Sequence, residues 1–194
     1  VNTRLVARFG NDGFSGLLRQ EISRFGVDLS SAVIDGTRNG GIVFIILDSC
    51  GNNTMVADLG SNLLLDADDI SRTSGLFEDS DLLLLQLEVS DSANGKAAAY
   101  ARKHGLKVVL NPAPMREFDV SILENIDVIT PNMQELEALL RNLNGESSIC
   151  AGEKDCVKIA DAARHLFTFG VKEIVVTLGK RGSLLVKEGS SALF

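Results

Sequence analysis

One stretch of the sequence, "ITPNMQELEAL" (129–139), combines residue types that could bind a phosphorylated ligand. Asn132 and Glu135 stand at the start of an amphipathic helix, where they form the pattern of a capping box and could serve the helix alone. The same helix N-terminus presents unpaired N–H groups and a positive dipole, which attract phosphate. Glu135 would then hold a hydrated Mg²⁺, because this ion keeps several waters and binds few carboxylates. Both interpretations stay open.

A second stretch, "VVTLGKRG" (175–182), places Lys180 and Arg181 between two glycines directly after an apolar run. It could cradle phosphates, although it is not a Walker A motif, because Arg181 replaces the Ser or Thr that follows the lysine. The alternative is a plain hairpin turn.

Polar residues also follow two other apolar runs. Gln86 lies near the end of the run "DLLLLQL" (81–87) and Glu88 follows it, while Asn111 follows the run 107–110 and precedes Pro112. Proline lacks the N–H that would continue a strand, so the chain must leave the sheet there. In open parallel sheets, ligands bind at the carboxyl ends of strands. Glu88 by itself is explained equally well as a surface residue or a helix cap.

The elements that must position these residues alternate between strand and helix. Apolar runs predict strands at 81–87, 107–110, 126–130, 173–178 and 183–186. Helical patterns lie between them, at 92–104, near 121, at 134–143 and at 157–169. This order predicts an α/β fold with a mostly parallel central sheet flanked by helices. The run Asp81–Leu87 alternates so little that both faces of its strand are expected to be covered.

The N-terminal part has a different pattern. Leu17, Leu18, Ile22 and Phe25 predict one face of a helix that stops at Gly26. The run 41–47 and the segment 54–62 flank a turn and predict a hairpin. The segment from about Thr37 to Leu65 is therefore expected to be an antiparallel β excursion from a single domain spanning 1–194.

Composition excludes several classes of function. The chain has 194 residues and a net charge of -7, with no basic cluster for nucleic acid. Its apolar runs are far shorter than the roughly 20 residues that span a bilayer. Three cysteines lack C-x-x-C spacing, and nothing reads as a signal peptide, so a cytoplasmic protein with reduced thiols is expected.

Taken in order, the short motifs resemble those of the PfkB family of sugar kinases, most closely the ribokinase type. They are "GNDGFSG" (10–16), "GSN" (60–62), "QLE" (86–88), "LNPAP" (110–114), "ITPNMQELEAL" (129–139) and "VVTLGKRG" (175–182). The resemblance covers essentially the whole chain. It implies a ribokinase-like fold and transfer of the ATP γ-phosphoryl group to a hydroxyl of ribose or a similar small sugar.

The resemblance also implies roles for particular residues. Glu88 would bind a hydroxyl of the sugar, Asn132 would contact the ATP phosphates, and Glu135 would organise Mg²⁺. The ATP cradle would consist of Thr177, Leu178, Gly179, Lys180, Arg181 and Gly182. The excursion 37–65 would form a lid that closes over the sugar and mediates homodimerisation.

The sequence departs from the family pattern in two ways. Met133 stands where the family has a glutamate. The Gly-Gly-Lys-Gly loop would precede Val1, and the Gly-Ala-Gly-Asp signature, with the catalytic Asp, would follow Phe194. The site of a monovalent cation such as K⁺ would also lie outside the chain. The residues given are therefore expected to be an internal fragment that is inactive alone. Two alternatives remain: a catalytically dead or truncated protein that binds nucleotide or a partner chain, and a kinase acting on fructose or a nucleoside.

Overall fold

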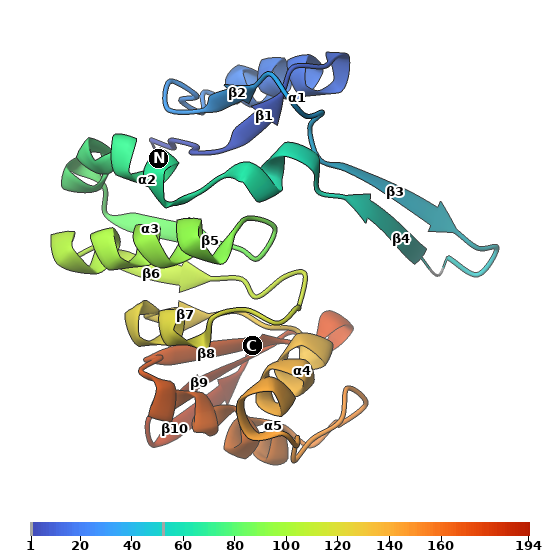
Figure 1. Ribbon diagram of the computed structural model, residues 1–194. Coiled ribbons are helices and arrows are strands. Elements are labelled where there is room, and N and C mark those ends of the chain that lie inside the picture. The colour runs from blue at the N-terminus through green and yellow to red at the C-terminus, as the bar shows by residue number, and fades with distance from the viewer. Residues whose placement is uncertain (1, 52) are drawn as a thin grey trace. The chain divides into compact units, whose positions relative to one another are not determined.

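The computed structural model describes residues 2–51 and 53–194, which form two compact units. The first unit comprises Val1–Thr73 and Glu88–Ala93, and the second comprises Ser74–Leu87 and Asn94–Phe194. Each unit is described by itself below, with the element labels of Figure 1.

The first unit carries a short parallel sheet and a separate antiparallel hairpin. Its elements are β1 (Arg8–Gly10), α1 (Gly13–Arg24), β2 (Val33–Asp35), β3 (Ile42–Leu47), β4 (Asn53–Asp58), η1 (Gly60–Leu64) and α2 (Ala67–Arg72). β1 pairs with β2 in parallel, and β3 pairs with β4 in antiparallel register. The antiparallel part predicted at 37–65 is thus confirmed, but the hairpin ends at Asp58 and a 3₁₀ helix follows it (Figure 1).

Asp12 holds the base of this hairpin against the start of α1. Its Oδ1 accepts a hydrogen bond from the N–H of Ser15 at 2.9 Å, and its Oδ2 accepts one from the N–H of Gly40 at 2.7 Å. Hydrogen bonds from Gly40 and Ser15 lower the pKa of Asp12 to about 2. A side chain at Gly10 would place its Cβ 2.1 Å from the nitrogen of Gly40, so the close approach requires glycine.

The second unit is a six-stranded sheet with helices. Its elements are η2 (Ser74–Asp79), β5 (Leu82–Leu85), most of α3 (Asp91–His104), β6 (Lys107–Leu110), η3 (Val120–Asn125), β7 (Val128–Ile129), α4 (Met133–Asn144), α5 (Cys156–Ala163), η4 (Arg164–Phe169), β8 (Glu173–Thr177), η5 (Gly179–Arg181), β9 (Ser183–Lys187) and β10 (Ser190–Leu193). The strand order is β10-β9-β8-β7-β6-β5. β5 to β8 run parallel, while β9 and β10 join antiparallel. The mostly parallel sheet predicted from the sequence is confirmed, whereas β10 was not predicted.

Helix α4 shows how local sequence sets an element. Asn132 caps its N-terminus, and Gly145 ends it in the left-handed conformation with φ of 75°. Leu136, Leu139 and Leu140 recur at helical spacing and are buried, so one face of α4 joins the core. α4 and α5 pack on strands β8 and β9 respectively (Figure 1).

Two sequence predictions are corrected in this unit. The helix expected at 157–169 is α-helical only to Ala163 and continues as the 3₁₀ helix η4, which ends where Gly170 adopts φ of 97°. The strand expected at 81–87 is restricted to β5, and Leu82 and Leu84 are 47% and 69% exposed. β5 is the last strand of the sheet, so a continuous apolar run did not mean that both faces were covered.

Candidate active site

The carboxyl ends of the parallel strands bring the predicted polar residues of the second unit to one edge of the sheet. The N–H of Thr177, at the end of β8, donates to the carbonyl of Pro131 at 2.9 Å, and Asn132 forms a parallel bridge with Thr177. The N–H of Thr130 donates to Leu110, and that of Asn111 donates to Leu85, both at 2.9 Å. Segments that are separate in sequence therefore leave the sheet side by side.

Asn132 and Glu135 form a complete capping box at the start of α4. Asn132 Oδ1 accepts a hydrogen bond from the N–H of Glu135 at 2.9 Å, and Glu135 Oε2 accepts one from the N–H of Asn132 at 2.8 Å. The capping interpretation is thus confirmed as a geometric fact.

Each member of the pair keeps a polar atom that the cap does not use. Within residues 2–51 and 53–194, neither Asn132 Nδ2 nor Glu135 Oε1 makes a hydrogen bond to the protein. Both side chains are partly exposed. An amide donor beside the N-terminus of a twelve-residue helix fits a phosphate oxygen. The remaining carboxylate oxygen fits a water in the shell of a Mg²⁺ ion that is held mainly by phosphates.

Among the described residues, no three His, Cys, Asp or Glu side chains are grouped as metal ligands.

The turn after β8 is closed by its own backbone hydrogen bonds. Gly179–Arg181 form the 3₁₀ helix η5, and the N–H of Leu178 donates to the carbonyl of Gly182 at 2.8 Å. Gly182 has φ of 88° and ψ of -138°, a region that other residues rarely adopt. The turn joins antiparallel strands β8 and β9, so the hairpin alternative also describes its geometry. The start of the turn nonetheless lies beside Asn132, because Thr177 bridges to that residue.

The predicted ATP-binding residues of this turn differ in how exposed their side chains are. Thr177, Gly179 and Lys180 are exposed at the edge, whereas the side chain of Leu178 is buried, so that residue could offer a ligand only its backbone. The guanidinium of Arg181 donates to the carbonyls of Lys154 at 3.1 Å and Glu153 at 3.3 Å. Arg181 thus fastens the loop before α5 to the turn.

Glu88 follows the edge strand β5 and lies where the chain passes from one unit to the other. It is half-buried, whereas the preceding Leu87 is 1% exposed. The N–H of Leu87 donates to the carbonyl of Ala113 at 2.9 Å, so the "LNPAP" segment pairs with the "QLE" segment. Sequence patterns do not indicate this pairing, because the partners are far apart along the chain. Asn111 itself is exposed.

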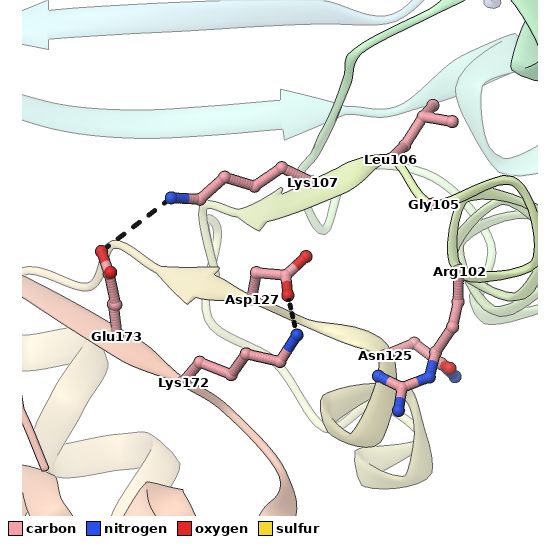
Figure 2. Close-up of a pocket in the computed structure, with 8 residues that line it drawn as sticks. All are labelled: Arg102, Gly105, Leu106, Lys107, Asn125, Asp127, Lys172 and Glu173. Atoms are coloured by element: carbon pink, nitrogen blue, oxygen red, sulfur yellow. Dashed lines mark hydrogen bonds and ion pairs between the residues drawn. The ribbon is translucent and has the colours of Figure 1, made fainter.

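An open pocket lies at the opposite end of the sheet, where the parallel strands begin, and it is lined by paired charged side chains (Figure 2). Asp127 accepts hydrogen bonds there from the ammonium of Lys172 and from the N–H of Val108 at 2.8 Å, and Lys107 lies 4.0 Å from Glu173. Burial opposes ionisation of Asp127, but the bonds from Lys172 and Val108 outweigh it and hold its pKa below the usual value. These charges are paired across β6, β7 and β8, which indicates a structural role.

Among the described residues, no helix has the length and apolar character needed to cross a membrane.

Comparisons with known proteins place this arrangement in context. The model of the pfkB family carbohydrate kinases matches residues 1–193. A ribokinase of Staphylococcus aureus is 28% identical over 98% of this chain and 60% of its own length. A deoxyribokinase of Salmonella typhi is 29% identical over 93% of this chain and 56% of its own length. The structure of Arabidopsis thaliana ribokinase complexed with ribose and ATP superimposes with a TM-score of 0.83 at 26% identity, covering 100% of this chain and 61% of that one. The chain thus spans about three fifths of the length of these relatives.

Proposed function

Since the chain belongs to the pfkB family of carbohydrate kinases, we propose that it carries the nucleotide-binding edge and part of the sugar-binding site of a ribokinase-type enzyme. The full-length protein would transfer the γ-phosphoryl group of ATP to a hydroxyl of ribose or a similar small sugar, in the cytoplasm. The observation that carries this proposal is the joining of Asn132 to the turn after β8 through Pro131 and Thr177.

This edge suits phosphoryl transfer, which depends on positioning and on stabilisation of charge. The N-terminus of α4 and Asn132 Nδ2 would bind ATP phosphates, and the turn Thr177–Gly182 would hold the nucleotide beside them. Mg²⁺, when bound, would neutralise developing charge on the phosphates. Glu135 would orient a water of that ion through the oxygen that the capping box leaves unused.

The direct test is an assay that measures how much ADP is released when ribose is added. We expect the full-length protein with ATP and Mg²⁺ to show ribose-dependent turnover, and residues 1–194 alone to show none above background, because no Gly-Ala-Gly-Asp sequence occurs among them. Deoxyribose, fructose and a nucleoside serve as alternative acceptors in parallel assays. Robust ribose-dependent turnover by residues 1–194 would show that the catalytic residues have been misplaced.

One observation keeps a second candidate in view. Met133, which stands where the family has a glutamate, is 8% exposed and so places an apolar group at the first turn of α4. A protein that binds ATP but phosphorylates none of the sugars tested would fit a nucleotide-binding or partner-binding protein without kinase activity.

Glu88 is proposed to bind a hydroxyl of the sugar. We expect Glu88→Ala in the full-length protein to raise the KM for sugar about tenfold, because a hydrogen bond to a charged acceptor contributes roughly 1.5 kcal/mol or more. The KM for ATP should change little. Glu188→Ala, which removes an exposed carboxylate from the turn between β9 and β10, is the matched control. Equal changes in both KM values would instead assign Glu88 to folding.

The hairpin β3–β4 is proposed to act as the lid and as a contact between two copies of the protein. Its exposed apolar side chains include Phe44, Ile45, Ile46, Met55 and Val56. Because consecutive strand residues point to opposite faces, this run makes both faces apolar. An isolated two-stranded hairpin of this kind is marginal in water, so one face would cover the sugar and the other would meet a second copy.

A further inference from the structure

The backbone that leads into Glu88 is held by three hydrogen bonds from two segments, α3 and the loop after β6. The side chain of Asn94, 3% exposed in α3, donates from Nδ2 to the carbonyl of Gln86 at 2.7 Å. The N–H of Leu87 donates to Ala113 at 2.9 Å. Arg116 donates from Nε to the carbonyl of Leu87 at 3.0 Å. Both backbone groups of Leu87 are thus satisfied by the loop after β6.

The loop after β6 is shaped to make these contacts. The N–H of Asn111 makes the last ladder bond, to Leu85, and Pro112 has no N–H to continue the ladder. The N–H of Ala113 then donates to the carbonyl of Asn111 at 2.8 Å, which turns the chain so that Ala113 can accept from Leu87. The Asn-Pro pair therefore ends one strand and supports the residues after its neighbour.

Arg116 donates to two backbone carbonyls from one planar group, which only a guanidinium can do. Its Nε binds Leu87 while its NH1 donates to the carbonyl of Glu117 at 2.7 Å. Two donors in one rigid plane fix both carbonyls relative to each other, whereas a lysine ammonium is a single point charge on a flexible stem.

Fixing the carbonyl of Leu87 also fixes the start of Glu88. The carbonyl of Leu87 and the nitrogen and Cα of Glu88 lie in one planar peptide unit, so the position from which the Glu88 side chain starts is set by that unit. A group that binds substrate must be held closely, since a displacement of about 1 Å can cost on the order of 100-fold in rate.

We propose that Arg116, supported by Asn94, is a positioning residue that sets the orientation of the Glu88 carboxylate for the sugar. The inference rests on the proposed sugar-binding role of Glu88. In this proposal Arg116 acts through the peptide that joins Leu87 to Glu88, and its role requires no contact with the reacting atoms.

The test compares Arg116→Ala and Arg116→Lys with wild type in the full-length protein. We expect the KM for ribose to rise about fivefold in Arg116→Ala and by a smaller factor in Arg116→Lys, with the KM for ATP within twofold of wild type. Arg102→Ala is the matched control, because Arg102 also donates one guanidinium hydrogen bond to a backbone carbonyl, that of Glu124 at 3.1 Å. It should lower the melting temperature comparably and leave both KM values unchanged.

A double-mutant cycle with Glu88→Ala separates this inference from the proposed function. If Arg116 acts through Glu88, Arg116→Ala adds nothing to the ribose KM once Glu88 is gone. Additive effects, or equal rises in the KM for ribose and ATP, would overturn the inference. A wild-type ribose KM in Glu88→Ala itself would instead overturn the proposed role of Glu88. If Arg116→Ala fails to fold, Arg116→Lys gives the same cycle.

Discussion

Replacing Glu135 with glutamine is expected to lower kcat by up to about 100-fold at limiting Mg²⁺ while leaving the melting temperature almost unchanged. Glutamine keeps the size of the side chain and can still accept the hydrogen bond from the N–H of Asn132, so the capping box survives. It loses the negative charge that would attract a metal-bound water. The measurement is a Mg²⁺ titration of kcat alongside thermal melts of the full-length protein.

Two further variants separate capping from metal binding. Asn132→Ala removes the side chain that accepts from the N–H of Glu135, which should cost about 0.5–2 kcal/mol of stability. Asp119→Ala removes the cap of η3, where Asp119 accepts from Ser121 at 3.0 Å, and should lower the melting temperature without changing the Mg²⁺ requirement. If Glu135→Gln melts early but titrates with Mg²⁺ like the wild type, Glu135 is only a cap.

Gly182→Ala is expected to cost about 3 kcal/mol of stability and to abolish ATP binding. The backbone at this position has φ of 88°, and a Cβ would lie 1.8 Å from the carbonyl oxygen of Phe194. That oxygen accepts from the N–H of Ser183 at 3.0 Å, so relieving the clash would pull the end of β10 away from β9. The turn Thr177–Gly182 would move with it. Denaturant unfolding and calorimetric titration with ATP measure the two effects.

Gly189→Ala provides the matched control for Gly182→Ala. Gly189 also has a positive φ, of 77°, but a Cβ there would meet nothing within 4 Å. The substitution should therefore cost only about 1–2 kcal/mol of backbone strain and leave ATP binding intact. Should Gly182→Ala bind ATP with wild-type affinity, the turn would be no part of the nucleotide site.

Much of the fold could be read from local patterns, because those patterns act over a few residues. The spacing of Leu136, Leu139 and Leu140, with Asn132 before and Gly145 after, placed α4 almost to the residue. The order of strands and helices gave the parallel sheet, and its carboxyl edge followed from the rule for parallel strands. Local pattern did not predict the change from α to 3₁₀ helix after Ala163. It also did not predict the exposure of Leu84, which depends on the place of its strand in the sheet.

The candidate site also has features that could be predicted from the sequence and features that required the tertiary structure. Residue types and short spacing were enough to propose Asn132, Glu135 and the turn after β8 as candidate site residues. Only the tertiary structure decided that Thr177 donates to Pro131 and that Arg181 binds the carbonyls of Glu153 and Lys154.

The physical reason is the range over which each interaction is encoded. A cap or a turn is complete within about four residues, and an apolar stripe repeats every three or four residues, so the sequence by itself determined those features. The hold of Arg116 on Leu87 joins residues 29 positions apart, and that of Arg181 on Lys154 joins residues 27 apart. Any backbone carbonyl could serve such an arginine, and none is marked in the sequence. Tertiary packing of strands and helices selected Leu87 and Lys154, because it set which loops lie beside one another.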